Sequence, residues 1–284
     1  MRKPCSNMIT SRGCPMNCVF CTIHSVFGWN WRSRSAENVI NEIRFLTEKY
    51  HIREIQFEDD NIALNRKRME KICDLIISEG LDIRWTTPNG IAIWTLDVEL
   101  LRKMKKSGCY SLSFGIESGD PVTLKFIGKP VNLAKAKNVI KQANKIGIYT
   151  HGFFVFGFPH ENLSSVTNTL RFASESDLDL ASFYIATPYP ATRLYEIMKR
   201  EKMLQEDSWE TFRTMKATAD TEYFRKEELD AMQTRMYTTF FEKRIVNYLR
   251  PKTLLGRLRR LENTEDLRFI ARLGLRFLDI LKKH

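Results

Sequence analysis

The sequence lacks the features of a membrane protein or a secreted protein. No segment approaches the ~18 consecutive apolar residues that a membrane-spanning helix requires. The opening residues Met1-Arg2-Lys3-Pro4 are not followed by the apolar run of a secretory signal. Of the 6 cysteines, three lie close together and three are isolated, so they do not form the pairs of a disulfide framework. We therefore expect a cytoplasmic protein in a reducing compartment.

The chain also lacks a single basic tract that would account for its positive charge, because Lys and Arg are spread over the predicted helices. Its formal net charge is +11 and its pI is about 9.4, but lysines and arginines are mixed with acids, as in residues 66–71. No basic segment is interleaved with aromatic residues in the way that favours stacking of single-stranded bases. The pattern predicts a solvated basic surface and argues against a nucleic-acid partner. Such a surface would also attract an anionic substrate or a membrane surface.

Three closely spaced thiols are the most informative feature that is present. Cys14, Cys18 and Cys21 follow the spacing C-x3-C-x2-C, so one tight loop can turn all of them toward a common centre. Three thiolates suit an iron-sulfur cluster that keeps one iron without a protein ligand. A structural zinc site normally has four protein ligands, and this alternative remains open at this point. The fourth ligand would come from one of the isolated cysteines, Cys5, Cys73 or Cys109.

Strands and helices alternate along residues 7 to about 187. The predicted strands span 7–13, 54–58, 82–87, 110–116, 148–156 and 180–187, and the predicted helices begin at Ser35 and span about 65–79, 97–107, 132–146 and 163–175. Pro88 is expected to end the third strand. This alternation predicts an α/β fold with a parallel sheet that is closed or nearly closed into a barrel. Ligands of such folds bind at the carboxyl ends of the strands.

The cysteine spacing, with an aromatic residue at Phe20 just before the last cysteine, resembles the radical SAM superfamily. The resemblance implies that Cys14, Cys18 and Cys21 ligate a 4Fe-4S cluster and that S-adenosylmethionine (SAM) binds the open iron. It also implies a (β/α)6 partial TIM barrel over residues 1–204, with a helical extension over 205–284. An electron from the cluster would cleave SAM to a 5′-deoxyadenosyl radical, which abstracts hydrogen from an unreactive carbon.

Two acidic positions after predicted strands extend this resemblance. Phe57-Glu58-Asp59-Asp60-Asn61 is similar to the Phe-x-Asp-Asp pattern of the branch that often has a cobalamin domain, which implies that Asp59 and Asp60 hold SAM. Read without the resemblance, these two acids could cap a helix or be solvated. Phe114-Gly115-Ile116-Glu117-Ser118-Gly119 is similar to the same branch's Gly-Ile-Glu-Ser-Gly run, which implies that Glu117 and Ser118 contact SAM. For Glu117 a buried ion pair remains the alternative.

Three further motifs follow in the order that the resemblance implies. Lys129 lies where relatives place a basic residue against the SAM carboxylate, although a loop lysine is usually solvated. Gly157, in Phe156-Gly157-Phe158-Pro159, implies a bare backbone that can approach adenine. Pro188-Tyr189-Pro190-Ala191-Thr192 resembles Pro-x-Pro-Gly-Thr, with Ala191 in place of the usual glycine.

The branch resembled includes cobalamin-dependent methyltransferases and the anaerobic oxidative cyclase of chlorophyll synthesis. Its cobalamin-binding motif Asp-x-His-x-x-Gly does not occur here. We therefore expect cobalamin only through another domain or chain. The expected substrate is a small molecule or lipid, and a flavodoxin- or ferredoxin-like protein would supply electrons. The alternatives are methyl or methylthio transfer with a separate cobalamin-binding partner or on RNA, and a non-catalytic metal-binding module.

Beyond about residue 205 the pattern changes to helices packed across the barrel. Trp209, Phe212 and the run from Met236 to Leu249 carry this prediction. In the tail, residues 267–284 place apolar side chains on one helical face, which would dock on the domain or contact a membrane peripherally. Among the histidines, His151 is the candidate for a substrate contact, with a hydrogen-bonded core histidine as its alternative.

Overall fold

Six parallel strands form the sheet on which the other elements pack. The computed structural model describes residues 2–204 and 212–249. The strands are β1 (Cys5–Met8), β4 (Glu54–Phe57), β5 (Arg84–Ile91), β6 (Cys109–Glu117), β7 (Tyr149–Phe156) and β8 (Leu180–Ile185), and their spatial order follows the chain. β1 and β8 are the two edges of this sheet, so the barrel is partial, as the sequence predicted. All carboxyl ends of parallel strands lie along one rim.

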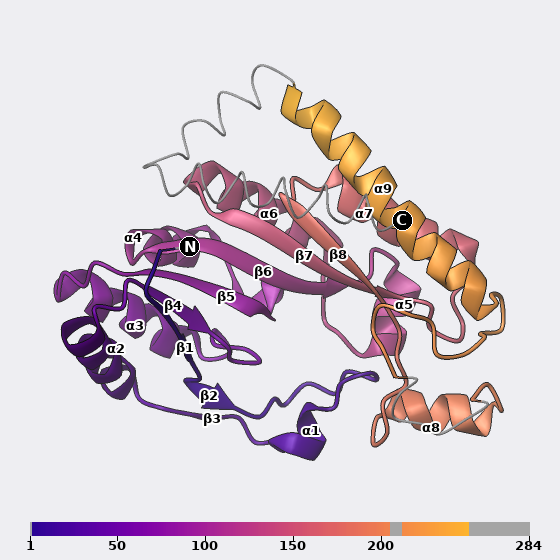
Figure 1. Cartoon of the computed structure of the whole chain (residues 1–284), viewed down its shortest axis with the longest axis horizontal. Helices are drawn as coiled ribbons and strands as arrows, with labels where there is room; N and C mark the ends of the chain where they lie inside the picture. The colour runs from indigo at the N-terminus through magenta and orange to yellow at the C-terminus, as the bar shows by residue number, and fades with distance from the viewer. Residues whose placement is uncertain (1, 205–211, 250–284) are drawn as a thin grey trace.

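A helix connects each strand to the next along the chain. These helices are α2 (Ala36–Tyr50), α3 (Arg66–Ser78), α4 (Val98–Lys106), α6 (Leu133–Ile146) and α7 (Leu163–Glu175). Ser35 caps α2 as predicted, because its side chain accepts a hydrogen bond of 3.1 Å from the Asn38 backbone N–H. Figure 1 shows α2, α3 and α4 on the β4 and β5 side of the molecule, and α9 (Lys226–Leu249) on the β8 side.

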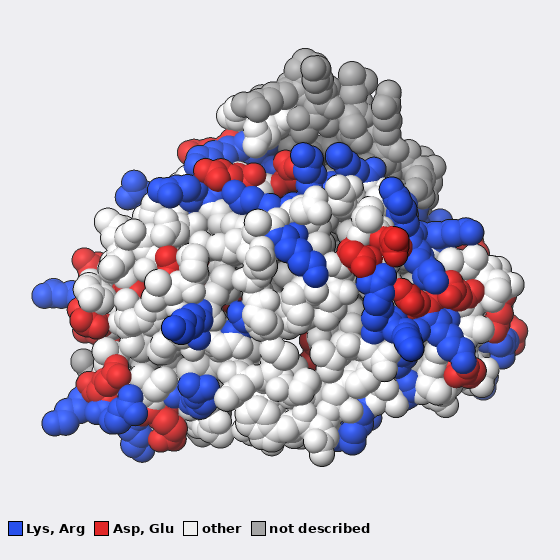
Figure 2. Space-filling model, turned by 180° about the vertical axis from the view of Figure 1, so that it is seen from behind, with Lys and Arg blue, Asp and Glu red and all other residues white. Residues whose placement is uncertain are grey.

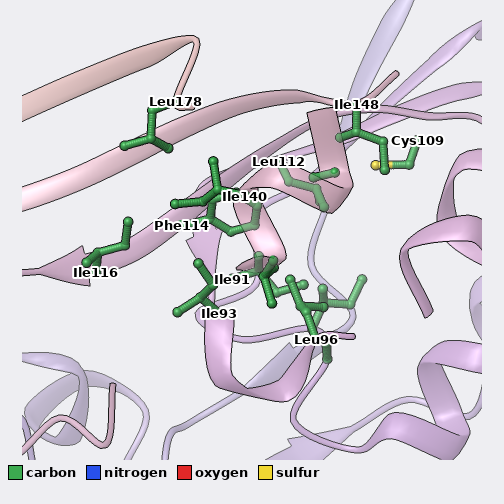
Figure 3. Packing of buried hydrophobic residues seen from close by; sticks show 14 of the residues in the cluster. Ile91, Ile93, Leu96, Cys109, Leu112, Phe114, Ile116, Ile140, Ile148 and Leu178 are labelled. Atoms are coloured by element: carbon green, nitrogen blue, oxygen red, sulfur yellow. The ribbon is translucent and has the colours of Figure 1, made fainter. Parts of the chain in front are cut away.

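The core lies between the sheet and these helices. Figure 3 shows Leu112 and Phe114 of β6 beside Ile140 of α6, and Ile116 farther along the same strand; all of these side chains are buried. Glu117 and Gly115 occupy the alternate positions of the same strand and face the other side. The apolar alternation of β6 thus fixes which of its residues reach the inside of the barrel.

The structure corrects two predicted strand boundaries. β5 continues through Pro88 to Ile91. Its pairing with β6 skips between Thr87 and Ile91, so Pro88 lies where the ladder does not need its missing N–H. The predicted strand 7–13 is divided into β1 and β2 (Ser11–Arg12), and β2 pairs antiparallel with β3 (Arg32–Ser33).

The prediction also missed three short helices that contact the cysteine loop. They are α1 (Ile23–Val26), α5 (Pro121–Ile127) and α8 (Arg193–Arg200). The longer helices were predicted from apolar residues that recur at helical spacing over several turns, and each of these three helices is too short to show that recurrence. Their ends nevertheless contact the cysteine loop directly, because Val19 N–H donates to the Ile127 carbonyl at 2.9 Å and its own carbonyl accepts from Leu194 N–H at 2.8 Å.

Helix α9 covers the β8 edge of the sheet. Gln233 Nε2 donates to the Phe183 carbonyl at 2.7 Å, and the Phe183 N–H donates to the Tyr237 hydroxyl at 3.0 Å. These side chains satisfy backbone groups that an edge strand otherwise exposes. The predicted helical run from Met236 to Leu249 is part of this single helix. Trp209 and the predicted tail helix lie outside the described residues.

Charges of both signs are intermixed at the surface. Figure 2 shows Lys and Arg next to Asp and Glu along the upper and side margins of one face, with a largely uncharged area across its centre. Ion pairs join acids to bases at separate positions among the described residues, for example Arg44 with Glu79 at 2.7 Å and Lys103 with Asp74 at 2.9 Å. In the described part of the chain, no helix is both long and apolar enough to cross a membrane.

Candidate active site

A cavity of about 330 Å³ lies at the carboxyl ends of the strands, where the fold predicts a ligand. Cys14, Cys18 and Cys21 all line it. All six cysteines are free of disulfides. Cys73 and Cys109 are buried elsewhere in the core, so neither lies with the three thiols of the cavity.

The local backbone explains how the cysteine loop turns its thiols inward. Gly13 has a φ of +85°, and a Cβ at this position would lie 2.3 Å from the Asn30 carbonyl oxygen. Only glycine therefore permits this approach. Within the loop, the Cys21 N–H donates to the Cys18 carbonyl at 3.1 Å. His24 of α1 lies 3.0 Å from the Cys14 carbonyl through Nε2 and stacks on Trp29.

Burial keeps these thiols protonated in the absence of a metal. Desolvation raises the pKa of Cys18 to about 11 and raises the pKa values of Cys14 and Cys21 above their ordinary value, while the charge of Lys129 opposes the rise. A metal must therefore displace protons to bind. Within the described residues, no three His, Cys, Asp or Glu side chains are placed to hold a single metal ion. Three thiols facing one cavity suit a cluster in which each sulfur binds a different iron.

Glu117 and Lys129 form an ion pair in the same cavity. Lys129 Nζ donates to Glu117 Oε1, and the two side chains are only 11% and 9% exposed. Burial alone would lower the pKa of Lys129, but the Glu117 carboxylate raises it above its ordinary value. Lys129 also lies 5.7 Å from the centre of the Trp94 ring. Its side chain is thus held inside the barrel, unlike that of a solvated loop lysine.

The backbone around this ion pair is specialised to make room for it. Glu117 has a φ of +68°, a conformation that costs energy for a residue with a side chain. A Cβ on Gly115 would lie 2.7 Å from both Glu117 Oε1 and Lys129 Nζ. Gly128, at φ +79°, ends α5 and turns Lys129 toward the cavity.

The adjacent acids Asp59 and Asp60 have different environments. Asp59 is buried, and its carboxylate accepts hydrogen bonds from Thr10 N–H at 3.0 Å, from Thr10 Oγ1 at 2.8 Å and from the Ser11 hydroxyl. It does not belong to the cavity lining, whereas Asp60 does. Burial, followed by the charge of Asp59, raises the pKa of Asp60. Asp59 holds the segment that leads to the cysteines, and Asp60 is the acid available to a ligand.

The remaining predicted residues divide in the same way. Phe20 lines the cavity. Ser118 points away from it, since its hydroxyl lies 2.9 Å from Thr169 Oγ1 and accepts from the Asp120 N–H at 3.0 Å. Gly157, at φ +83°, faces Leu229 of α9, and its N–H donates to Glu161 Oε2 at 2.7 Å. SAM contacts by Ser118 and Gly157 stay predictions.

Sequence reasoning missed several residues of this site. Asn89, Gly90, Trp94 and Phe153 all line the cavity. Glu161, also missed, lies outside the cavity lining; it is fully buried and accepts from the N–H groups of Gly157 and Phe158 and from the Thr123 hydroxyl. The sequence could have indicated Glu161 as a candidate, because it is an acid two residues after Pro159 of the predicted Gly-x-Pro turn. The cavity residues of β5 were missed because the strand was predicted to end at Pro88.

His151 matches the core alternative for that residue. Its Nε2 lies 2.8 Å from Ser182 Oγ, and its ring packs edge-on against Phe153. Burial lowers its pKa to about 4, so the imidazole is neutral at physiological pH. It is absent from the cavity lining.

Comparisons with known proteins agree with this site. The family model described as "Radical SAM superfamily" matches residues 8–173 of this chain. An uncharacterized methyltransferase of Pyrococcus horikoshii is 39% identical over 89% of this chain and 53% of its own length. Cytidylyl-2-hydroxyethylphosphonate methyltransferase of Streptomyces wedmorensis is 36% identical over 66% of this chain and 36% of its own length. The chain thus spans about half or less of these relatives.

Solved structures show the same fold. The radical SAM methyltransferase TsrM of Kitasatospora setae, with cobalamin and a [4Fe-4S] cluster bound, has a TM-score of 0.63 at 18% identity, covering 69% of this chain and 39% of its own. The cobalamin-dependent radical enzyme OxsB has a TM-score of 0.63 at 17% identity, covering 82% of this chain and 41% of its own. The family uses a 4Fe-4S cluster and SAM. With a family match over residues 8–173 and three thiols facing one cavity of a partial barrel, this chain belongs to the radical SAM superfamily.

Proposed function

We propose that this chain is the SAM-cleaving core of a radical enzyme that modifies an unreactive carbon of a small molecule. Cys14, Cys18 and Cys21 would ligate the 4Fe-4S cluster, and SAM would occupy the rest of the cavity. When bound, the reduced cluster supplies one electron that splits SAM into methionine and a 5′-deoxyadenosyl radical. The observation that carries the proposal is that the three thiols and the Glu117–Lys129 ion pair line one cavity of about 330 Å³.

The charged residues of the cavity match the charged groups of SAM. Lys129 supplies a cation for its carboxylate, and Glu117 and Asp60 supply acceptors for its ammonium and ribose hydroxyl groups. Because Lys129 and Glu117 already satisfy each other, binding replaces one ion pair by two new contacts and leaves no buried charge alone. The walls formed by Ile91, Trp94 and Phe153 keep the site apolar around the reacting carbon.

The relatives support two outcomes after SAM cleavage. Two similar proteins are named methyltransferases, and a third, from Cereibacter sphaeroides, is named an anaerobic magnesium-protoporphyrin IX monomethyl ester cyclase. All three names fit small-molecule chemistry. We propose hydrogen abstraction by this core, with methyl transfer when a cobalamin-binding domain or partner is supplied. A flavodoxin- or ferredoxin-like protein would deliver the electron.

Reconstitution of the cluster tests the first part of the proposal. The 284-residue protein, treated anaerobically with iron and sulfide, should be brown and hold about four irons per chain. Changing Cys14, Cys18 and Cys21 to alanine together should abolish iron binding. The matched control is Cys5→Ala, an exposed cysteine away from the cavity, which should keep full iron content. Stoichiometric zinc that survives the triple substitution would reject the cluster and favour a structural metal-binding module.

SAM cleavage tests the second part. With dithionite, the reconstituted protein should release 5′-deoxyadenosine and methionine even without substrate. Methyl-labelled SAM should transfer its label only when a corrinoid-binding protein is added. The chain alone should not retain a corrinoid through gel filtration. SAM binding without cleavage under any reductant would identify a non-catalytic SAM-binding protein instead.

A further inference from the structure

The two-stranded ribbon beside the cysteine loop places two arginines directly opposite each other. Arg12 of β2 is the register partner of Arg32 of β3, so both side chains project from the same face of the ribbon. Both residues are exposed. We infer that Arg12 and Arg32 form a clamp for a phosphate or phosphonate group of the substrate, at the entrance to the cavity.

The first argument is that the pair is unfavourable without an anion. Like charges directly opposite in an antiparallel pair repel and destabilise the ribbon. From residue 4 to residue 36 the sequence contains no aspartate or glutamate. Arg34, the next arginine, is already paired with Glu42. Neither Arg12 nor Arg32 forms an ion pair within the described part of the chain, so an external anion is the group that would neutralise both.

The second argument is that the two guanidinium groups are held close to the same residue. Arg32 Nη2 donates to the Phe27 carbonyl and its Nη1 to the Asn30 carbonyl, both at 2.9 Å. Arg12 Cζ lies 5.9 Å from the centre of the Phe27 ring. These contacts orient Arg32 but use only part of its donors, and the N–H groups of Arg12 have no acceptor among the described residues. A tetrahedral anion such as phosphate can accept hydrogen bonds from two planar guanidinium groups at once.

The third argument is the position of the ribbon relative to the reacting centre. Arg12 precedes Cys14 by two residues, and Cys14 lines the cavity. The segment that leads from the cysteine loop to β3 starts at Ile23, which also lines the cavity. In the same segment, His24 contacts the Cys14 carbonyl. Figure 1 shows β2, β3 and α1 as neighbours at the lower margin of the molecule. An anionic group held there leaves the rest of a small substrate free to enter the cavity.

This inference rests on the proposed function for the identity of the ligand as a substrate, but the anion site can be measured without it. We would titrate the 284-residue protein with pyrophosphate and with cytidine monophosphate by calorimetry, using uncharged cytidine as the ligand control. The wild-type protein should bind both phosphates saturably and cytidine far more weakly. Arg12→Gln and Arg32→Gln should each weaken phosphate binding on the order of tenfold. Arg102→Gln, an exposed arginine on α4, is the matched control and should bind normally.

Chemical unfolding supplies a readout that general loss of charge would not move. In phosphate-free buffer, Arg12→Gln should have a higher unfolding midpoint than the wild type, because the repulsion is removed. Arg32→Gln should gain less, because it also loses its hydrogen bonds to the Phe27 and Asn30 carbonyls. Pyrophosphate should raise the midpoint of the wild type and of Arg102→Gln but not of the two ribbon variants. Equal responses of all four proteins would overturn the clamp.

Two further measurements separate this inference from the proposed function and from other anions. Substrate-independent formation of 5′-deoxyadenosine and SAM affinity should be unchanged in both ribbon variants, since neither arginine lines the cavity. A parallel loss of SAM affinity would mean that the pair holds SAM and would overturn the substrate assignment. Competition by an RNA oligonucleotide at far lower concentration than pyrophosphate would likewise overturn it in favour of a nucleic acid. If the protein binds pyrophosphate but never cleaves SAM, the clamp stands and the proposed function fails.

Discussion

The Glu117–Lys129 ion pair makes the strongest prediction about stability. Replacing Lys129 with methionine keeps most of the side-chain volume but leaves the Glu117 carboxylate without its partner. The two side chains are 11% and 9% exposed, so water can replace the lost interaction only in part. Exposed ion pairs contribute at most about 1 kcal/mol, whereas removal of one partner of a buried pair costs about 3–5 kcal/mol.

We expect Lys129→Met to lower the free energy of unfolding by about 3 kcal/mol, the lower end of this range, because the pair borders a cavity. The contact of Lys129 with the Trp94 ring, 5.7 Å from the ring centre, adds to the loss. A domain of this kind is stable by about 5–15 kcal/mol, so the variant should still fold. The double variant Glu117→Gln/Lys129→Met should recover part of the loss, since it buries no unpaired charge.

The pH dependence follows from the direction of the shift. The pKa of Lys129 is raised in the folded protein, so its contribution is complete below the unfolded value of about 10.4 and is lost as pH rises through the folded pKa. Lys129→Met lacks this cation, so its deficit in stability relative to the wild type should shrink as pH rises through the folded pKa of Lys129.

Urea unfolding monitored by circular dichroism, at several pH values between about 7 and 11, measures both effects. Lys125→Met is the matched control, because Lys125 lies on α5 four residues away and is exposed. It should change stability by less than about 0.5 kcal/mol at every pH. If Lys129→Met were as stable as Lys125→Met at neutral pH, or if its deficit did not shrink as pH rose through the pKa of Lys129, the ion pair would not be stabilising in the way argued here.

Substitutions at three other residues test separate contacts. Asp59→Ala should lower stability by about 2–4 kcal/mol and reduce iron incorporation, because the Ser11 hydroxyl and nearby donors lose their acceptor; normal iron content would show that this acid does not position the cysteine loop. Ala191→Gly should raise stability by up to about 1 kcal/mol, because Ala191 has a φ of +66°; a lower thermal midpoint would contradict this. Burial raises the pKa of Glu161 to about 7, so wild-type stability should fall as pH rises from about 5 to 7, a slope that Glu161→Gln should remove. SAM affinity should survive Glu161→Gln but fall in Glu161→Leu, since only an amide oxygen can still accept from Gly157 N–H.

The sequence alone determined the order of strands and helices and the three cysteines at their rim. Both are local properties: apolar residues recur at the period of the element that buries them, and a C-x3-C-x2-C spacing fits within one loop. Ser35 as a helix cap and the parallel order of the strands were predicted for the same reason. The sequence also showed that Ala191 replaces the glycine of the Pro-x-Pro-Gly-Thr motif. The structure explains why glycine is usual there, because Ala191 has a positive φ.

Only the tertiary structure decided what each side chain near the rim contacts. Asp59 and Asp60 are adjacent in sequence, yet one accepts three hydrogen bonds from residues 10 and 11 and the other lines the cavity. Glu117 and Lys129 become partners because a bulge in the β6–β7 pairing and a glycine turn after α5 bring them together. Arg12 and Arg32 are opposed through the antiparallel pairing of β2, which was predicted as part of the strand 7–13, with β3, which was not predicted. Such contacts join residues that are distant in sequence or that differ in burial, so the local hydrophobic periodicity of the sequence cannot predict them.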